Sequence, residues 1–180
     1  MYFSAKYPSP LGELTLACDG AGNLTGLWLE GQKYFLAALP EPPVPRDNMP
    51  IFAQAGDWLD RYFAGGRPAG SELPLAPIGG AFRQEVWAIL RRIPYGQVAT
   101  YGEISREIAA RRGLDSISAQ AVGGAVAHNP ISIIIPCHRV VGSGGSLTGY
   151  AGGLPRKLAL LAHEGADVGR FSVPRRGTAL

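Results

Sequence analysis

The hydrophobic residues of the first 30 positions recur with a period of two, which strongly limits how this part of the chain can fold. Apolar and polar residues alternate in three segments separated by turn residues, namely YFSAKY, ELTLACD and NLTGLWLE. Successive side chains of a strand point to opposite faces of a sheet, so this alternation is typical of half-buried strands. The sequence therefore predicts a small antiparallel meander between Tyr2 and Glu30.

The periodicity changes to that of helices further along the chain. The stretch PEPPVPRDNMP is too rich in proline to hold regular structure, because proline lacks the N–H donor. Helical patterns then follow in four segments, namely IFAQAGDWLDRYFAGG, AFRQEVWAILRRI, TYGEISREIAARR and SAQAVGGAVAHNP. Ser118 is a suitable N-cap for the last of these, and Asn129-Pro130 ends it.

The third and fourth predicted helices are joined by a short polar turn, GLDS. This arrangement is typical of a helix-turn-helix unit, but helical cores that bind no DNA contain such pairs as well. The best candidate for a domain boundary is RPAGSELPLAPIGG. We therefore expect an α+β protein with an N-terminal α/β domain and linker over residues 1–78. A mainly helical C-terminal domain should cover 79–168, followed by a flexible basic tail over 169–180.

Composition excludes several classes of protein. No apolar run approaches the roughly 20 residues that span a bilayer, and the N-terminus lacks the pattern of a secretory signal, so we expect a cytoplasmic protein without a membrane partner. The two cysteines, Cys18 and Cys137, are too few for a disulfide framework and lack the neighbours of a zinc site. The formal net charge of +3 permits contact with a polyanion but does not require it.

The fourth predicted helix is unusually poor in side-chain bulk. Its small residues are Ala119, Ala121, Gly123, Gly124, Ala125 and Ala127. Each glycine costs roughly 1 kcal/mol of helix propensity, so a compensating reason is expected. That reason is either tight packing inside the protein or close approach to a nucleic acid.

Cys137 lies in the segment with the strongest chemical signal, ISIIIPCHRVVGSGG. The run Ile131 to Ile135 predicts a buried strand that holds the cysteine in place. His138 and Arg139 can favour the thiolate, which is the nucleophilic form. Neighbouring side chains of an extended chain point apart, so His138 reaches the thiol only if the chain turns or a water bridges them. An inert buried thiol is the alternative.

The motif PCHRV around Cys137 is preceded by AVGGAVAHNP and followed by TGYAGGL and LLAHEG. In this order the motifs closely resemble the methylated-DNA protein-cysteine methyltransferase family, also called O6-alkylguanine-DNA alkyltransferases, over residues 80–165. The N-terminal third resembles that family's ribonuclease H-like domain more loosely. The resemblance implies that an alkyl group passes from O6 of guanine in DNA to the cysteine. O4-alkylthymine is a further candidate substrate.

The resemblance also assigns catalytic roles. Cys137 matches the acceptor, and His138 the residue that takes the thiol proton through a water. Glu164 matches the carboxylate that orients the histidine, and Asn129 an asparagine that braces the turn before the active site. The thioether product is too stable to leave, so each molecule acts once. The reaction needs no metal and no cofactor.

The partner that the resemblance implies is double-stranded DNA, bound through the minor groove with the damaged base flipped out. We expect the protein to act on it as a monomer. The implied substrate-binding residues are Tyr101, Val140, Tyr150, Ala151 and Gly152. The expected DNA contacts are Gln120, Ala121, Gly123, Gly124, Ala127 and Arg139.

One position departs from the family pattern. Gln120 stands where the family often places an arginine that fills the gap left by the flipped base. Either Gln120 fills this gap without a charge, or Arg111 and Arg112 in the neighbouring turn supply the charge. We expect DNA binding that is weaker or differently dependent on salt, with the chemistry retained.

Three other functions remain open at this point. The first is a non-catalytic protein that binds alkylguanine lesions, although such relatives lack the acceptor cysteine. The second is a cysteine hydrolase that turns over many substrates. The third is a helix-turn-helix regulator that binds a defined DNA sequence.

Overall fold

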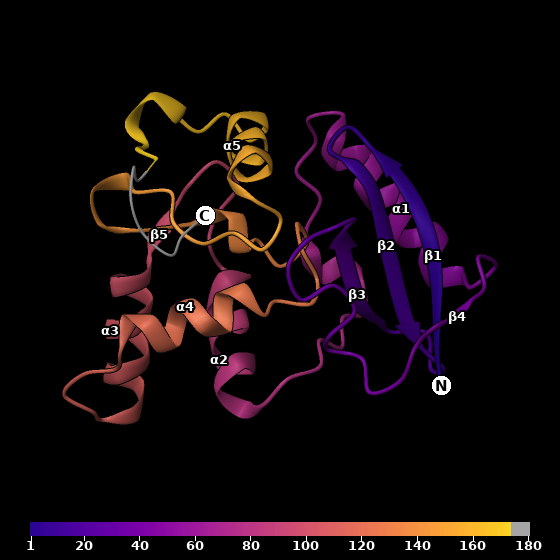
Figure 1. The fold of residues 1–180 in the computed structure, drawn as a ribbon, viewed down its shortest axis with the longest axis horizontal. Coiled ribbons are helices and arrows are strands. Elements are labelled where there is room, and N and C mark those ends of the chain that lie inside the picture. The colour runs from indigo at the N-terminus through magenta and orange to yellow at the C-terminus, as the bar shows by residue number, and fades with distance from the viewer. Residues whose placement is uncertain (174–180) are drawn as a thin grey trace. The chain divides into compact units, whose positions relative to one another are not determined.

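A computed structural model describes residues 1–173 of the chain, which form two compact units (Figure 1). The N-terminal unit comprises Met1–Gly79 together with a short later segment, Pro130–Ile134. The C-terminal unit comprises Gly80–Asn129 and the chain from Ile135 onward. The segment Pro130–Ile134 is not part of the N-terminal domain that the sequence predicts, because nothing in its pattern shows what it packs against.

The N-terminal unit is built on a four-stranded sheet with the order β3-β2-β1-β4. Its first three strands confirm the predicted antiparallel meander, namely β1 (Tyr2–Ser9), β2 (Gly12–Asp19) and β3 (Leu24–Leu29). β4 (Val44–Pro45) pairs in parallel with Phe3 and Ser4. The expectation that the proline-rich stretch holds no regular structure is therefore wrong for β4. Proline is tolerated there because an edge strand has a side that needs no N–H donor.

Both faces of β3 are buried, although its alternating pattern predicts one exposed face. Two segments also bond to its outer edge. The backbone N–H of Leu24 donates to the carbonyl of Pro74 at 2.8 Å, and that of Leu27 donates to the carbonyl of Pro130 at 2.8 Å. Ser132 N–H donates back to the Leu27 carbonyl at 2.8 Å. These bonds explain why Pro130–Ile134 belongs to this unit.

The predicted strand from Ile131 to Ile135 is buried but is not a strand. Ile131 makes one isolated bridge to Leu27. The chain then turns at Ile133, whose φ of 70° lies in the left-handed region that β-branched residues rarely adopt. The turn is closed by a hydrogen bond from Ile134 N–H to the Ser132 carbonyl at 2.8 Å. An apolar run shows that a segment is buried, but it does not distinguish a strand from a buried turn.

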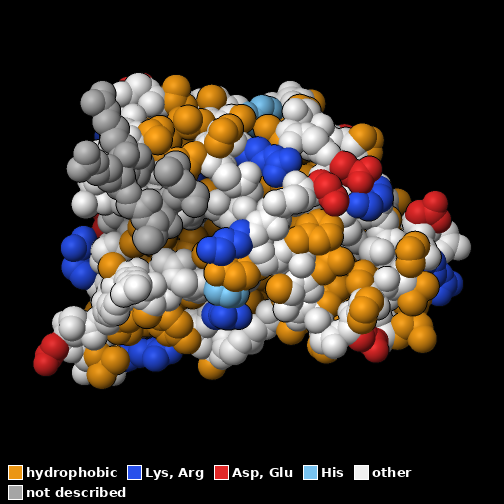
Figure 2. All heavy atoms as spheres, in the orientation of Figure 1, with side chains coloured by type: hydrophobic (Ala, Val, Ile, Leu, Met, Phe, Trp, Pro, Cys, Tyr) orange, Lys and Arg blue, Asp and Glu red, His pale blue; other side chains and the backbone are white. Residues whose placement is uncertain are grey.

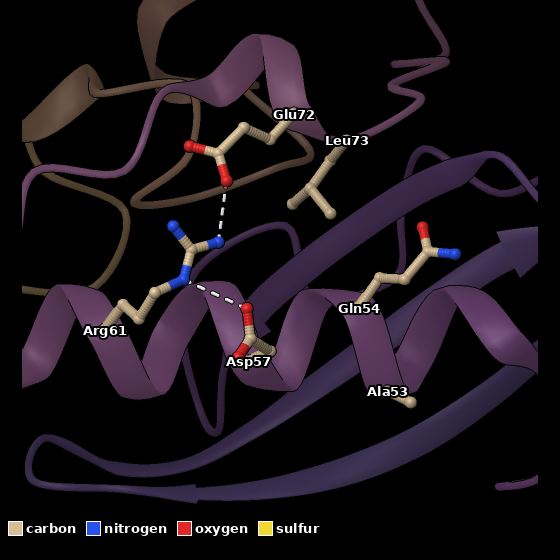
Figure 3. Close-up of a pocket in the computed structure, with 6 residues that line it drawn as sticks. All are labelled: Ala53, Gln54, Asp57, Arg61, Glu72 and Leu73. Atoms are coloured by element: carbon tan, nitrogen blue, oxygen red, sulfur yellow. Dashed lines mark hydrogen bonds and ion pairs between the residues drawn. The ribbon is translucent and has the colours of Figure 1, made fainter.

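Helix α1 (Pro50–Phe63) packs on this sheet and confirms the predicted helix. Trp58 and Tyr62 stack at 5.5 Å between ring centroids, and the Tyr7 hydroxyl donates to Asp60 at 2.6 Å. On its exposed side Arg61 bridges the carboxylates of Asp57 and Glu72 (Figure 3). These three side chains line a pocket of about 430 Å³. The guanidinium is bonded to both carboxylates, and the three side chains together carry a net charge of −1. The lining residues include no cysteine, serine or histidine.

In its described part, up to residue 173, the C-terminal unit contains four α-helices and a two-stranded parallel sheet. The helices are α2 (Ala81–Leu90), α3 (Tyr101–Arg112), α4 (Ala119–Ala127) and α5 (Leu154–His163), and the strands are β5 (Ala99–Thr100) and β6 (Val140–Val141). Helices α2, α3 and α4 confirm the sequence-based predictions. Among the residues that the structure describes, no helix is both long enough and apolar enough to cross a membrane.

Helices α3 and α4 pack together as the predicted helix-turn-helix pair (Figure 1). Thr100 and Glu103 form a capping box at the start of α3. Gly113 ends this helix in the left-handed conformation that glycine adopts without strain. Ser118 caps α4, as predicted, by accepting from Gln120 and Ala121. The Ser105 hydroxyl donates to the Ile117 carbonyl and so holds the connecting turn against α3.

The chain after α5 folds back onto its own unit. Residues Val168–Arg170 form a 3-10 helix, and the Ser172 carbonyl accepts from Leu147 N–H at 2.8 Å. Phe171 packs against an apolar cluster of Val141, Leu147, Leu154 and Leu161. The prediction of a flexible tail from 169 onward is therefore wrong for residues 169–173. The rest of that prediction concerns residues 174–180, which lie outside the described part of the chain.

Candidate active site

Cys137 opens a short 3-10 helix, Cys137–Arg139, instead of ending a strand. Its N–H donates to the Ile135 carbonyl at 2.8 Å, and its carbonyl accepts from the N–H of Val140. The residue is only 4% exposed. The chain turns here, but Nδ1 of His138 has no hydrogen-bond partner among the described residues, so contact with the thiol requires the bridging water.

His138 and Glu164 form a fully buried pair behind this turn. Nε2 of His138 lies 2.7 Å from Oε1 of Glu164. A carboxylate only accepts hydrogen bonds, so Nε2 carries the proton. Nδ1 is buried and has no hydrogen-bond partner among the described residues. Burial lowers the pKa of His138 and outweighs the opposing effect of Glu164, so the imidazole is neutral near pH 7 and Nδ1 offers a lone pair.

Glu164 is held by a network of donors. Arg139 donates from Nε to Oε2 at 2.8 Å and from Nη2 to Oε1 at 2.9 Å, and Gly96 N–H donates to Oε2 at 3.2 Å. Burial alone would raise the pKa of Glu164, but the bonds from His138 and Arg139 lower it well below its usual range. Gly96 must be glycine, because its φ is 75° and a Cβ there would lie 2.7 Å from the Glu164 carbonyl oxygen.

The guanidinium of Arg139 is bonded inside the protein. Its guanidinium binds Glu164 through two nitrogens, and its third, Nη1, donates to the Ile93 carbonyl at 2.6 Å. It also lies over the ring of Tyr95, 5.7 Å from the centroid. All of its nitrogens are therefore used inside the protein. In this structure Arg139 supports the relay, and its contact with DNA stays a prediction.

Asn129 is buried at the end of α4, close to the cysteine. Its Nδ2 donates to the Ile135 carbonyl at 2.7 Å and so closes the excursion of residues 130–134 at its base. Its side chain also hydrogen-bonds the Cys137 thiol. Burial raises the pKa of this thiol, and the bond from Asn129 opposes the rise.

Tyr101 reaches from the start of α3 to the loop that precedes α5. Its hydroxyl donates to the Thr148 carbonyl at 3.0 Å, with the Gly149 carbonyl at 3.3 Å. Burial raises the pKa of Tyr101 to about 12, and the charge of a Cys137 thiolate makes a smaller contribution to this rise. Of the other predicted substrate-binding residues, Val140 and Tyr150 are buried, and Ala151 and Gly152 are half-buried.

Lys157 is a site residue that the sequence analysis missed. It is fully buried in α5, and its Nζ donates to the carbonyls of Val140 and Thr148. A signal was available, because Lys157 lies three residues after Leu154 and three before Leu160, on the apolar stripe of the helix. A lysine in that position is either buried or extends its ammonium past the stripe to water.

Helix α4 divides its small residues between two faces. Ala125 and Val122 face the interior, where the indole N–H of Trp87 donates to the Ala125 carbonyl at 2.9 Å. The predicted DNA contacts Gln120, Ala121 and Gly124 are exposed, whereas Gly123 and Ala127 are half-buried. A Cβ at Gly124 would meet open space. Packing inside this unit therefore gives no reason for glycine at position 124.

The two arginines that could supply the charge missing at Gln120, Arg111 and Arg112, are both paired with carboxylates. Arg111 pairs with Glu107 at 2.6 Å, and Arg112 pairs with Glu85 at 2.6 Å. Figure 2 shows Lys and Arg side chains on this face of the protein in separate small groups among hydrophobic and uncharged atoms, apart from what the grey residues cover. The formal net charge of +3 is thus not gathered into one patch on the face drawn.

Together these features define a class of protein in which a buried cysteine is served by a histidine–carboxylate pair beside a helix-turn-helix unit. Residues 81–166 match the family described as "6-O-methylguanine DNA methyltransferase, DNA binding domain". Residues 2–77 match the ribonuclease-like domain of the same family. The chain belongs to the 6-O-methylguanine DNA methyltransferase family.

Individual proteins that are similar to this chain carry names that match this family. The methylated-DNA--protein-cysteine methyltransferase of Mycobacterium tuberculosis is 45% identical over 156 residues, which cover 87% of this chain and 88% of that protein. The protein of the same name from Haemophilus influenzae is 42% identical over 159 residues, or 88% of this chain and 83% of that protein. The crystal structure of Mycobacterium tuberculosis OGT in complex with DNA superposes with a TM-score of 0.74 at 40% identity, covering 94% of each chain.

Proposed function

We propose that this protein repairs DNA by transferring the alkyl group of O6-alkylguanine to Sγ of Cys137, irreversibly and once per molecule. One observation carries the proposal: the buried cysteine adjoins a neutral histidine whose Nε2 is bonded to Glu164 and whose Nδ1 has no protein partner. This is the arrangement of a nucleophile, a base and an orienting carboxylate. The names of the relatives, which are methylated-DNA--protein-cysteine methyltransferases, support the same chemistry.

The proposed reaction begins when the Cys137 thiol loses its proton, through a water, to Nδ1 of His138. Glu164 stabilises the imidazolium that forms. The thiolate then attacks the alkyl carbon, so that the S–C bond forms while the C–O6 bond breaks. The electron pair of that bond stays on the guanine, which leaves as an anion and then takes up the proton. A backbone donor in the pocket, for which Ala151 N–H is the candidate, stabilises the developing negative charge.

The reaction stops at the thioether, because no group in the proposed mechanism can expel the alkylated sulfur. The same residues that activate the thiol therefore act only once. A cysteine hydrolase would need a second step in which water attacks a labile acyl–sulfur bond, and an alkyl thioether offers no such bond.

The proposed DNA interface is the exposed face of α4. Gly124 and its neighbours leave this face without bulk, so a backbone or a groove wall can approach it closely. The minor groove of B-DNA is narrower than the major groove, which makes small side chains an advantage there. A base stacked in the duplex is out of reach of a buried thiol, so the proposal includes flipping of the damaged base into the pocket.

A titration with damaged DNA tests the proposal. A duplex oligonucleotide with one O6-methylguanine is added in excess, and the repaired strand is counted per protein chain. We expect repair to stop at one lesion per chain, to be absent in Cys137→Ala and to be unchanged in Cys18→Ala. Cys18 is the matched control because it is a buried cysteine in β2, within the other unit.

Two results would overturn the proposal in different ways. Repair of many lesions by each chain would show a multiple-turnover enzyme. Selective binding of the lesion without repair would show a non-catalytic lesion-binding protein.

A further inference from the structure

Lys157 is the only lysine or arginine side chain that is fully buried within residues 1–173. Removing an ammonium from water is costly unless its charge and its donors are satisfied. In the described part of the chain no carboxylate lies within ion-pair distance of it. Such a residue is expected to be retained for a reason other than stability.

The partners of Lys157 are two backbone carbonyls that frame Cys137. Nζ donates to the Val140 carbonyl at 2.5 Å and to the Thr148 carbonyl at 3.1 Å. Val140 closes the turn that begins at Cys137, because its N–H donates to the Cys137 carbonyl. The Thr148 carbonyl also accepts from the Tyr101 hydroxyl at 3.0 Å. The ammonium therefore joins α5, the cysteine turn and the pocket loop at one point.

The charge of Lys157 also acts on the reacting groups. Burial raises the pKa of the Cys137 thiol, and the hydrogen bond from Asn129 and the charge of Lys157 oppose this rise. Burial lowers the pKa of His138, and Lys157 lowers it further. Both effects keep the imidazole neutral and make the thiol easier to ionise.

Other ionisable groups near Lys157 do not replace this charge. Glu164 and Arg139 neutralise each other through two hydrogen bonds. Tyr101 faces the same carbonyl as Lys157 but is a neutral hydroxyl near pH 7. Lys157 thus supplies the uncompensated positive charge next to the thiol.

We propose that Lys157 is a positioning residue of the transfer reaction, which holds the cysteine turn against the pocket loop and favours the Cys137 thiolate. This inference rests on the proposed function, because it concerns how the same cysteine is activated. It adds to that function a cation from α5 that lies outside the Cys137–His138–Glu164 relay.

The proposal implies an upper pH limit for the reaction. Burial lowers the pKa of Lys157 from 10.5 to about 8, with the charge of Cys137 opposing the shift. The ammonium is therefore present below about pH 8 and is lost as the pH rises through that value. The groups that face it are Cys137 and His138 on the turn and Tyr101 on α3. None of these three groups loses a positive charge in this range, whereas Lys157 does.

The test measures the reactivity of Cys137 without DNA, so that its result does not depend on the proposed function. The rate of alkylation by iodoacetamide is followed against pH in a Cys18→Ala background for wild type, Lys157→Met, Lys157→Gln and the surface control Lys33→Met. Lys157→Gln keeps a donor for the carbonyls and removes the charge, whereas Lys157→Met removes both. The rate of methyl transfer from an O6-methylguanine duplex is measured on the same proteins.

We expect alkylation of both Lys157 variants to be about tenfold slower than that of wild type below about pH 8, where the ammonium is present, because the lost charge is equivalent to about one unit of thiol pKa. Above that pH the variants should approach the wild-type rate. Lys33→Met should match the wild type. Methyl transfer should be slower in both Lys157 variants, and Lys157→Met should be the slower of the two. An alkylation rate below about pH 8 that is unchanged in both variants would overturn the electrostatic role, even if thermal unfolding showed them to be less stable.

The wild type provides a second measurement in case the variants do not fold. Its rate of methyl transfer should rise with pH and then fall above about pH 8, as Lys157 loses its proton. A rate that stays level up to pH 10 would contradict the proposal. If iodoacetamide modifies Cys137 as expected and methyl transfer is absent, the proposed function fails while the role of Lys157 in thiol reactivity stands.

Discussion

The relay at the active site depends on two opposite uses of burial. Burial disfavours the charged form of both His138 and Glu164. For His138 this effect dominates, so the imidazole stays neutral. For Glu164 the hydrogen bonds from His138 and Arg139 dominate, so the carboxylate stays ionised. The pair therefore combines a proton acceptor at Nδ1 with a fixed anion at Nε2, which is what activation of a thiol needs.

Replacing His138 with alanine should remove the base and leave the nucleophile. We expect methyl transfer to slow about 10²- to 10⁴-fold, the usual contribution of a positioned general base. Single-turnover kinetics with an O6-methylguanine duplex would measure the loss, and His163→Ala serves as the control because that side chain is half-buried outside the relay. Transfer at the wild-type rate in His138→Ala would show that another group takes the proton.

Replacing Glu164 with glutamine should affect stability as well as activity. Arg139 would lose its carboxylate, and breaking a buried pair costs about 3–5 kcal/mol. The pKa of Glu164 is lower in the folded than in the unfolded protein, so its contribution is present above the unfolded pKa of about 4.3 and is lost as the pH falls. Urea unfolding should thus show a smaller loss of stability below pH 4 in Glu164→Gln than in wild type.

The catalytic residues were predictable from short motifs, and their supporting contacts were not. Cys137, His138, Glu164 and Asn129 lie together, as the family resemblance implies. The bonds of Arg139 were not predictable, because a basic residue beside a nucleophile fits either a DNA contact or a buried ion pair. Only the fold brings the second half of that pair, Glu164, close to it.

Among the elements, helix α4 has one face that packs inside its unit and another that is exposed. Its buried side packs through Ala125 against Trp87, and its exposed side leaves Gly124 open. Packing among the described residues therefore does not account for this glycine, whereas the proposed contact with DNA does.

Substitutions at Gly124 separate these effects. Gly124→Ala should stabilise the protein by about 1 kcal/mol, the difference in helix propensity, when measured by urea unfolding. Gly124→Leu should retain stability but weaken binding to a lesion-containing duplex, measured by fluorescence anisotropy, because its bulk fills the open face. Ala162→Leu, exposed on α5, is the control for an added surface leucine. Wild-type affinity in Gly124→Leu would place the DNA elsewhere.

The segment after α5 stabilises the loop that leads to the pocket. Phe171 packs on the cluster that contains Leu147, and Ser172 bonds to the Leu147 N–H. Phe171→Ala should therefore lower stability by about 1–3 kcal/mol and speed hydrogen exchange at the Leu147 amide. Val168→Ala, at an exposed neighbour, should do neither. Unchanged exchange at Leu147 in Phe171→Ala would show that the segment is only loosely attached.

Helices and the meander were predictable because their periods of 3.6 and two are repeated over many residues. Two elements were not. The apolar run Ile131 to Ile135 indicates burial without indicating shape, and Ile133 turns the chain against its own propensity. The strand Val44–Pro45 is too short to leave a pattern and exists only because β1 offers it an edge.

For the whole molecule, the chain between α4 and the cysteine is the feature that the sequence least reveals. Pro130–Ile134 leaves the C-terminal unit, bonds to β3 and returns two residues before Cys137. Asn129 joins the two ends of this excursion by its bond to the Ile135 carbonyl. The N-terminal unit therefore contributes to holding the segment that leads into the active-site turn, although the relay itself lies entirely in the other unit.

The central claim is that Cys137 is the acceptor, and the most direct test is to locate the transferred group. The protein is incubated with one equivalent of a duplex that contains O6-methylguanine, digested, and analysed by peptide mass spectrometry. We predict one added methyl group per chain, on the peptide that contains Cys137, in an amount equal to the guanine restored. A methyl group on Cys18 or on any other residue, or restored guanine with no methylated peptide, would contradict it.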